Sequence, residues 1–301
     1  MRAQTRGRHP DLGAALEHLL SSGGKRVRVA VALLTGGMLG ADTERLITLS
    51  AAIELLHTAT LVHDDLIDGS LLRRGNATLN AQWSPAATVL TGDYIFARAA
   101  VLAAETDSVS VMRLFAETLA TIVNGEITQL FSSHGLASRE NYDQRIYAKT
   151  ASMFELAAAA AAMLSPVPEA VVEQARSFGY QIGMAFQIVD DVLDFTGEQA
   201  TVGKPVASDL RQGLITLPAL SYLQTYPEDE DIQAIISGNG YNDRLMDRLV
   251  VSIRRSGAIE QSMEEARTYI GRGLEILAGL PAGIERKALE NLAGYIVDRS
   301  L

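Results

Sequence analysis

The clearest candidates for chemistry in this sequence are two groups of three aspartates with the same internal spacing. The groups are Asp64, Asp65 and Asp68, and Asp190, Asp191 and Asp194. In each group the first and last aspartates are four positions apart, so on a helix they share one face and the middle one flanks it. Each group ends a long apolar stretch, where three carboxylates are costly without a counter-charge. Facing each other, the two groups would form a negative pocket that metal cations neutralise.

The available side chains decide which metal such a pocket would hold. The chain has no cysteine, which excludes disulfides, thiolate metal sites and a cysteine nucleophile. Carboxylate oxygens favour hard ions, and Mg²⁺ keeps several waters and shares substrate phosphates. The alternative is that each group is a solvated helix end. Two groups with one spacing, both at the negative end of an expected helix, favour cations instead.

Basic residues that suit diphosphate oxygens occur at four places. They are Lys25, Arg26 and Arg28 after Gly23 and Gly24, Arg73 with Arg74, Lys149 beside Thr150, and Lys204 after Gly203. Arginine binds such oxygens in a bidentate manner, and lysine binds them as a point charge. Each basic group alone could be ordinary surface charge. Together with the two acidic groups they predict a pocket in which Mg²⁺ bridges carboxylates and phosphates.

Two further polar residues lie one or two helical turns before the aspartates. Gln187 is three positions before Asp190, and His57 is seven positions before Asp64. Each is therefore expected on the same helix face as its aspartate. Gln187 can serve a diphosphate or a developing positive centre. For both residues the alternative is a core position with a hydrogen bond to the backbone.

The elements that must carry these residues are expected to be helices. Strand signals are nearly absent, proline occurs eight times, and long stretches combine helical apolar spacing with high helix propensity. The expected helices cover residues 43–68, 85–105, 108–132, 139–164, 168–195, 215–225, 243–257, 258–280 and 283–299. No linker rich in Gly or Ser divides the chain. We predict an all-α, single-domain helical bundle over residues 1–301 with a central active-site cavity, and a flexible segment at residues 1–12.

Composition narrows the class of protein further. Apolar residues make up 48% of the chain and aromatic residues 6%, which fits a helical core of Leu, Ile, Val and Ala. The formal net charge of −10 argues against a general nucleic-acid surface. The N-terminus is basic but has no apolar stretch after it, and the longest candidate membrane span, near residues 157–164, is too short. We expect a cytoplasmic protein.

Taken together, these motifs resemble those of the trans-isoprenyl diphosphate synthases, or polyprenyl synthetases. The resemblance extends from about Leu16 to the C-terminus. The matching motifs are the two aspartate motifs at residues 61–68 and 186–194, Arg-Arg-Gly at 73–75, Gly-Gly-Lys-Arg-Val-Arg at 23–28, Lys-Thr-Ala at 149–151 and Gly-Lys-Pro at 203–205. Agreement at this many spaced positions is specific to the family.

The resemblance implies a reaction. An allylic diphosphate, bound through three Mg²⁺ ions, ionises to an allylic cation, and isopentenyl diphosphate attacks the cation through its double bond. A proton is then lost, which leaves a longer polyprenyl diphosphate. The family also implies a homodimer, and the release of a long greasy product would allow a peripheral membrane contact.

The same resemblance implies a role for each site residue. The direct metal ligands would be Asp64, Asp68 and Asp190. The residues that hold metal waters or orient the ligands would be Asp65, Asp191 and Asp194. The allylic diphosphate would be bound by Arg73, Lys149 and Lys204, and isopentenyl diphosphate by Lys25, Arg28, His57 and Arg74. Beside the reacting carbons, with dipoles that stabilise the cation, would lie Thr150 and Gln187.

Product length in this family is set by residues one or two turns before the first aspartate motif, which form the floor of a tunnel. Ala59, five positions before Asp64, is small and leaves the tunnel open at that level. Leu55 and Leu56 are candidates for a floor further down. We therefore predict a product of roughly C30 to C45. The alternative is that Ala59 only allows close helix packing.

The loop after Lys204 departs from the family pattern at two positions. Ala207 and Leu214 stand where the family usually has Gly and a second Lys, and Arg211 is close enough in sequence to replace that Lys.

Three other functions are alternatives to a medium- or long-chain synthase. A geranylgeranyl or farnesyl diphosphate synthase would have the same chemistry with a shorter tunnel. A terpene cyclase would not need the second diphosphate site, and a regulatory partner subunit would typically have lost one aspartate motif.

Overall fold

The computed structural model describes residues 10–21, 23–73, 75–131, 138–197, 206–237 and 242–299, and these are built almost entirely from α-helices. The all-α prediction is confirmed. The chain forms two compact units, unit 1 with residues 1–117 and 156–173, and unit 2 with residues 118–155 and 174–301. The unit boundaries fall within or at the ends of three helices, α6 (Val109–Phe131), α8 (Ser152–Met163) and α9 (Glu169–Thr196). A single domain over residues 1–301 stays a prediction.

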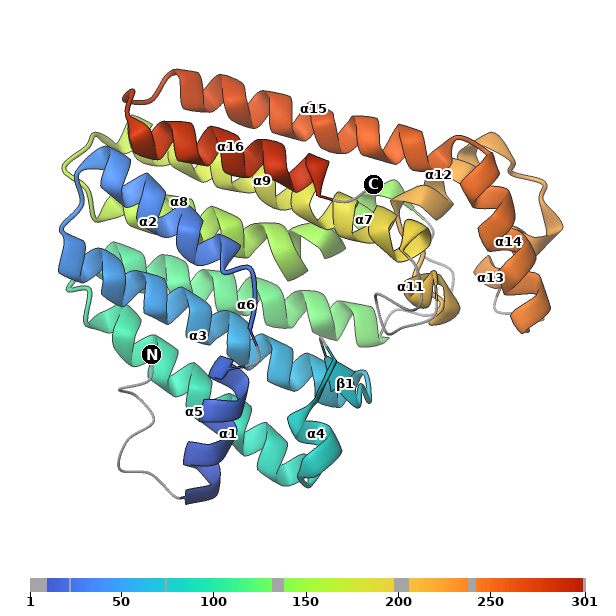
Figure 1. The fold of residues 1–301 in the computed structure, drawn as a ribbon, viewed down its shortest axis with the longest axis horizontal. Coiled ribbons are helices and arrows are strands. Elements are labelled where there is room, and N and C mark those ends of the chain that lie inside the picture. The colour runs from blue at the N-terminus through green and yellow to red at the C-terminus, as the bar shows by residue number, and fades with distance from the viewer. Residues whose placement is uncertain are drawn as a thin grey trace. The chain divides into compact units, whose positions relative to one another are not determined.

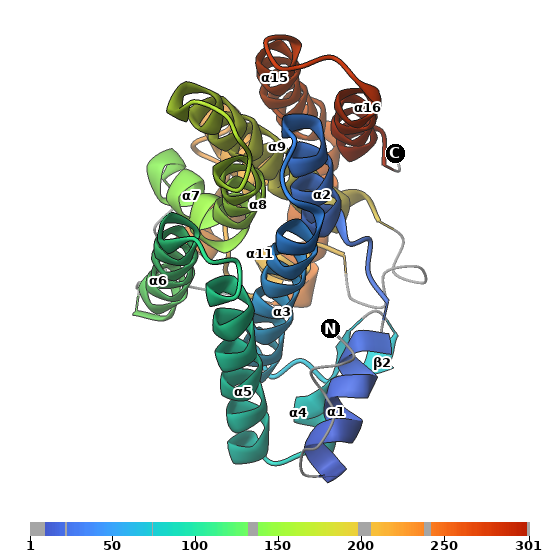
Figure 2. The same ribbon diagram turned by 90° about the vertical axis from the view of Figure 1, so that its left-hand side faces the viewer.

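Unit 1 is organised around one long apolar helix. Its elements are α1 (Pro10–Ser21), α2 (Val27–Leu39), α3 (Thr43–Ile67), the short strands β1 (Leu72–Arg73) and β2 (Asn76–Ala77), α4 (Leu79–Gln82) and α5 (Pro85–Ala104). Helix α3 packs against α2 and α5, which lie beside it in both ribbon views (Figures 1 and 2). Apolar residues on nearly all sides of α3 are buried, as expected for a central helix.

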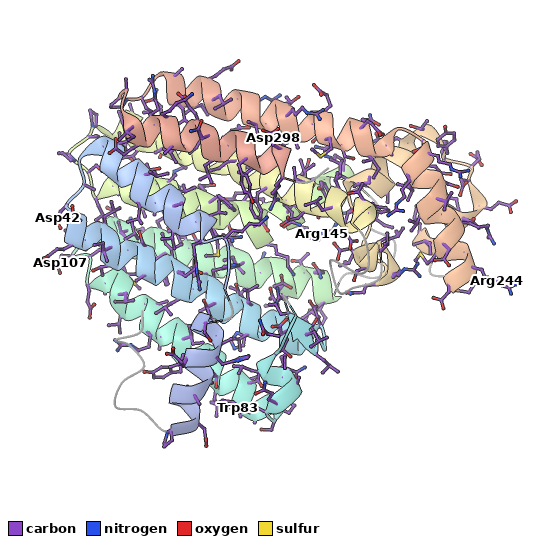
Figure 3. The ribbon with its side chains drawn as sticks, in the orientation of Figure 1. Asp42, Trp83, Asp107, Arg145, Arg244 and Asp298 are labelled. Carbon is purple, nitrogen blue, oxygen red and sulfur yellow. The ribbon has the colours of Figure 1, made fainter. Side chains whose placement is uncertain are left out.

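The start of α3 is fixed by its cap and by a contact to the far end of α5. The Asp42 side chain accepts a hydrogen bond from the Arg45 backbone N–H at 3.0 Å, which satisfies one of the free donors of the first turn. The Arg45 guanidinium donates to the Thr106 carbonyl at 2.8 Å. Figure 3 shows Asp42 and Asp107 at this same end of unit 1. The expected helix at residues 43–68 is confirmed with a one-residue difference at its end.

Two helices of unit 1 correct the expectation about membrane spans. Helices α3 and α5 are both long and apolar enough, by length and composition, to cross a membrane. The prediction that residues 157–164 come nearest to a span was therefore wrong. In α3, 56% of the apolar stretch is buried, and in α5 39% is buried. Burial of more than half of the stretch is typical of a core helix, so α3 is explained without a membrane.

Several short elements of unit 1 were not predicted. Strands β1 and β2 form an antiparallel hairpin with Leu72 opposite Ala77, too short for an alternating pattern to reveal it. The imidazole Nε2 of His18 on α1 lies 2.9 Å from the Ala77 carbonyl, and Figure 2 shows α1 beside β2. Helix α1 begins at Pro10, so residues 10–12 of the segment predicted to be flexible are helical, and residues 1–9 lie outside the described part of the chain.

Unit 2 contains the second aspartate group and the C-terminal helices. Besides parts of α6, α8 and α9, its elements are α7 (Arg139–Ile146), the π-helical turn η2 (Tyr147–Ala151), α11 (Ser208–Arg211), α12 (Leu217–Thr225), α13 (Glu230–Ile236), α14 (Asp243–Arg255), α15 (Ala258–Ala278) and α16 (Ile284–Asp298). Helices α15 and α16 pack side by side (Figure 1). The helices expected at 168–195, 215–225, 243–257, 258–280 and 283–299 are confirmed to within two residues at each end.

One expected helix of unit 2 is interrupted. Residues 139–164 were predicted as a single helix, but α7 gives way to the π-helical turn at Tyr147–Ala151 before α8 begins. Two glycines let neighbouring helices approach this turn. A Cβ added at Gly183 on α9 would lie 2.6 Å from the Ala151 Cα, and one at Gly125 on α6 would lie 2.6 Å from the Ala148 Cβ. Single π turns inside helices are frequent at functional sites.

Two glycine variants in unit 2 test this close packing. Gly183→Ala should lower the free energy of unfolding by about 1–3 kcal/mol, because the added methyl group meets the backbone of the π-helical turn. Gly271→Ala, in the middle of α15 with open space around it, should raise it by about 0.5–1 kcal/mol. Urea unfolding followed by circular dichroism measures both. Equal effects of the two substitutions would contradict the packing described here.

Candidate active site

The first aspartate group lies at the end of α3 in unit 1. Asp65 is buried and accepts a hydrogen bond from the Arg73 Nε at 2.8 Å, so a cation from the hairpin offsets its charge. Asp64 is half-buried, and Asp68 is exposed at the end of the helix, where its backbone N–H donates to the Asp64 carbonyl at 2.8 Å. The three carboxylates thus differ in burial, and the buried middle one is paired with Arg73.

The histidine before this group connects the end of α3 to α5. The His63 Nε2 lies 3.2 Å from the Val89 carbonyl, and its ring centroid lies 5.3 Å from that of Phe96. This contact needs a glycine on α5, because a Cβ at Gly92 would lie 2.2 Å from the imidazole Nε2. The helix end that carries Asp64 is therefore held against α5 by the adjacent side chain.

The basic loop before α2 is held by a buried ion pair. Gly23 and Gly24 have φ values of 75° and 144°, and Arg26 has a φ of 49°, so three residues in this short loop adopt positive φ values. The Arg26 guanidinium pairs with Glu54 on α3, whose side chain is only 6% exposed. No sequence signal marked Glu54 as part of the site, because one acid in an apolar helix has no diagnostic spacing. The pair fixes the loop that carries Lys25.

Arg28 and His57, both assigned to isopentenyl diphosphate by the resemblance, lie together. The Arg28 Nη1 and the His57 Nε2 are 3.3 Å apart, which joins the first turn of α2 to α3. Since Arg28 and Lys25 stand at the N-terminal end of α2, the helix dipole there also favours an anion.

The second aspartate group lies in the last two turns of α9 in unit 2. Asp191 is buried, and both of its carboxylate oxygens accept hydrogen bonds at 2.8 Å, from the Tyr142 hydroxyl and from the Gln187 Nε2. Burial raises the pKa of the Asp191 carboxyl from its ordinary value of 3.8 to about 7, although these two donors act in the opposite direction. Burial and the Asp191 charge also raise the pKa of the Tyr142 phenol.

The contacts of Gln187 fix the orientation of its amide. Because the amide nitrogen donates to Asp191, the amide oxygen is the atom that accepts from the Thr150 hydroxyl, at 2.5 Å. Lys149, next to Thr150 in the π-helical turn, lies 3.0 Å from the Glu126 carboxylate. The Lys-Thr motif and the second aspartate group are therefore joined by a continuous chain of side-chain hydrogen bonds.

Asp190 has a partner that sequence reasoning missed. The Arg299 guanidinium lies 2.8 Å from the Asp190 Oδ1 and donates to the Phe186 carbonyl at 2.8 Å, with its Cζ 3.9 Å from the centroid of the Phe186 ring. The Arg299 side chain is only 5% exposed. A single arginine two residues from the C-terminus gives no signal in the sequence that it pairs with an aspartate on α9.

Asp194 binds the backbone at the start of α11. Its two carboxylate oxygens accept from the backbone N–H groups of Ser208 and Asp209, both at 3.1 Å. The preceding residue, Ala207, has a φ of 55°, a conformation that glycine adopts at lower cost. Ala207, which departs from the family pattern described above, therefore adopts a backbone conformation that is strained for a residue with a Cβ.

The idea that Arg211 replaces the missing lysine at Leu214 is not supported by its contacts. The Arg211 Nη2 donates to Asp247 on α14 at 2.6 Å, and its Nε donates to the Val206 carbonyl at 3.0 Å. The guanidinium is thus bound to other parts of unit 2.

The remaining predicted residues are partly outside the described chain. Arg74 and Lys204 lie outside it. Ala59, Leu55 and Leu56 are buried in unit 1, at 0%, 3% and 0% exposure. Within the described ranges of the chain, no three His, Asp or Glu side chains form a group that could hold a metal ion. The donor types fit a hard cation, since the half-buried and exposed aspartates offer carboxylate oxygens.

The helical fold is that of solved prenyl synthases. The crystal structure of the polyprenyl synthase from Caulobacter crescentus CB15, complexed with calcium and isoprenyl diphosphate, matches with a TM-score of 0.92 and 37% identity over 100% of this chain and 92% of that chain. The family model of polyprenyl synthetases matches residues 9–252. The chain belongs to the polyprenyl synthetase family.

Similar proteins of known activity cover almost the whole chain. This chain is 39% identical to heptaprenyl diphosphate synthase component 2 of Geobacillus stearothermophilus over 291 residues. The aligned region covers 96% of this chain and 90% of the relative. This chain is also 38% identical over 286 residues to the all-trans-nonaprenyl-diphosphate synthase (geranyl-diphosphate specific) of Rhodobacter capsulatus, covering 94% and 87%. The prediction of the family is confirmed, and the chain is a polyprenyl diphosphate synthase.

Removing either partner of the Arg26–Glu54 ion pair should lower the free energy of unfolding by a different amount. Arg26→Gln should lower the free energy of unfolding by about 3 kcal/mol, because the Glu54 carboxylate stays in a buried place without its cation. Glu54→Gln should cost less, because the Arg26 side chain is 34% exposed and can turn to water.

Chemical denaturation of both variants and of the double variant measures this difference. The double variant should be more stable than Arg26→Gln alone, since it removes the unpaired charge. Equal losses for the two single variants would contradict the buried ion pair.

Proposed function

We propose that this enzyme condenses isopentenyl diphosphate with an allylic diphosphate, head to tail and in trans, using the two aspartate groups as its metal-binding residues. The observation that carries the proposal is that both groups are complete and stand at the ends of apolar helices in a chain of the polyprenyl synthetase family. A terpene cyclase and a regulatory partner subunit are disfavoured by the family match and by the intact motifs.

Mg²⁺ is the proposed cofactor, with three ions as the expected number. The chain would hold them with Asp64, Asp68 and Asp190. The other three aspartates accept hydrogen bonds from protein donors, which suits carboxylates that orient their neighbours. Asp190 is also paired, with Arg299, so metal binding there would need the guanidinium to share or release this carboxylate. The bound ions would supply positive charge to the leaving diphosphate.

The residues of the chain would bind the two substrates and stabilise the cation. Arg73, Lys149 and Lys204 would bind the allylic diphosphate. Lys25, Arg28, His57 and Arg74 would bind isopentenyl diphosphate. The negative end of the Gln187 amide dipole, whose oxygen accepts from Thr150, suits a developing allylic cation. Exclusion of water by apolar surroundings protects that cation.

The proposed product has 35 to 45 carbons, within the range expected from the sequence. Of the two relatives named above, one is a component of a heptaprenyl diphosphate synthase and the other is a nonaprenyl diphosphate synthase. Ala59 carries no side chain beyond its methyl group and is fully buried on α3, which fits a small residue beside a growing chain. Leu55 and Leu56, buried one turn earlier, are the proposed floor.

A homodimer in the cytoplasm is proposed, with peripheral membrane contact at most. On α5 the large residues Val89, Leu90 and Val101 are 40%, 68% and 40% exposed, which suits a second copy covering this helix. The Geobacillus relative is named as one component of a synthase, so a heteromer with another protein is the alternative. Sedimentation equilibrium of the purified chain tests the homodimer, because a chain that stays monomeric when alone would contradict it.

The condensation is tested by incubating the protein with Mg²⁺, labelled isopentenyl diphosphate and farnesyl diphosphate, then measuring the chain lengths of the dephosphorylated products. A ladder that ends between C35 and C45 is expected. Products that stop at C20 would indicate a shorter-chain synthase. Absence of incorporation would overturn the proposal in favour of a cyclase or a regulatory subunit.

Substitutions of Ala59 test whether the growing product runs beside this residue on α3. Ala59→Phe should shorten the longest product by at least one C5 unit, because the ring closes the path beside α3. Ala59→Ser, which is nearly the same size, should leave the ladder unchanged. A folded Ala59→Phe variant, verified by its thermal transition, with unchanged products would contradict the assignment.

A further inference from the structure

We propose that Tyr142 on α7 is a positioning residue of the second aspartate group, which acts through Asp191 to preserve metal binding by that group. The inference rests on the proposed function, since it concerns metal and diphosphate binding by these aspartates. Neither the sequence motifs nor the resemblance singled out Tyr142.

The contacts of Tyr142 leave little freedom for the Asp191 carboxylate. Tyr142 is 1% exposed, and its hydroxyl donates to the Asp191 Oδ2 at 2.8 Å, while the Gln187 Nε2 donates to the Oδ1 at 2.8 Å. With a donor on each oxygen, one from α7 and one from α9, the plane of the carboxylate is fixed. Loss of the hydroxyl leaves a buried acceptor oxygen without this donor, so the carboxylate must move or bind differently.

Tyr142 is itself held in place by its own helix. The Arg145 guanidinium carbon lies 5.6 Å from the centroid of the Tyr142 ring, and the Arg145 Nη2 donates to the Ile215 carbonyl at 2.7 Å. Figure 3 labels Arg145 in this region of unit 2. The tyrosine therefore acts as a fixed donor from α7 rather than as a mobile side chain that follows the aspartate.

The hydrogen bond also connects two parts of the site. Asp191 accepts from Gln187, and Gln187 accepts from Thr150 in the π-helical turn. Loss of the Tyr142 hydroxyl is therefore expected to shift the Asp191 carboxylate and, through Gln187, the Thr150 side chain. Asp191 is the direct neighbour of Asp190. Residues that orient metal ligands through hydrogen bonds typically change metal affinity by about 10–100-fold when they are removed.

The same unit contains a matched control. The Tyr222 hydroxyl donates to the Asp229 Oδ2, also at 2.8 Å, and Asp229 caps α13 by accepting from the Ile232 backbone N–H. This tyrosine–aspartate pair has the same chemistry and length but belongs to a helix cap outside the proposed site. Tyr222→Phe therefore removes an equivalent hydrogen bond without touching the metal-binding residues.

The experiment measures Mn²⁺ binding by electron paramagnetic resonance in the presence of inorganic diphosphate, using the full chain. Tyr142→Phe should raise the Mn²⁺ dissociation constant about 10-fold. Tyr222→Phe should bind Mn²⁺ like the wild type. Thermal transitions of both variants show whether either has lost its fold. Unchanged Mn²⁺ affinity in a folded Tyr142→Phe variant would overturn the inference.

A double-variant cycle shows whether Tyr142 acts through Asp191. If it does, Tyr142→Phe should have no further effect on Mn²⁺ affinity in an Asp191→Ala background, which removes both acceptor oxygens, so the two effects are not additive. Additive losses would show an unrelated structural role and overturn the inference. A wild-type protein that binds no Mn²⁺ with diphosphate would instead overturn the proposed function, and the two failures are thus distinguishable.

Discussion

Carboxylates near the carboxyl end of an apolar helix are disfavoured twice, by burial and by the negative end of the helix dipole. Both aspartate groups stand in such places, and the protein offsets the cost with a specific donor for each buried acid. Arg73 serves Asp65, and Tyr142 with Gln187 serves Asp191. These donors come from a hairpin, a neighbouring helix and a position one turn back along α9.

Charged groups outside the aspartate motifs are also offset by specific partners. Arg26 pairs with the buried Glu54, which ties the basic loop before α2 to the helix that carries the first group. Arg299 pairs with Asp190, which ties the end of the chain to the second group. Removing the more exposed partner of either pair is costly, because the buried Glu54 or Arg299 then keeps its charge without a counter-ion. They explain how polar groups keep fixed positions within largely apolar units.

Fold prediction from the sequence succeeded where apolar spacing was long and regular. Helices such as α3 and α9 were predicted to within two residues, because their patterns persist for many turns. The π-helical turn and the two-residue strands were missed, since so few residues have no periodicity of their own. The close approach at Gly183 depends on which helix lies opposite, which one sequence does not reveal.

The candidate site was predictable only in its motif residues. The aspartates, Lys149, Thr150 and Gln187 were identified because their spacing and family pattern carry information. Their partners Tyr142 and Arg299 are isolated residues of common types, so only the folded chain brings them to the aspartates. For the same reason, the contacts of Arg211 with Asp247 were not foreseen.

The central claim is that both aspartate groups bind metal together with a diphosphate. The most direct measurement is the number of Mn²⁺ ions bound in the presence of inorganic diphosphate, compared between the wild type, Asp64→Asn and Asp190→Asn. The account predicts that each substitution lowers the number or affinity of bound ions. Wild-type binding in either variant would contradict it.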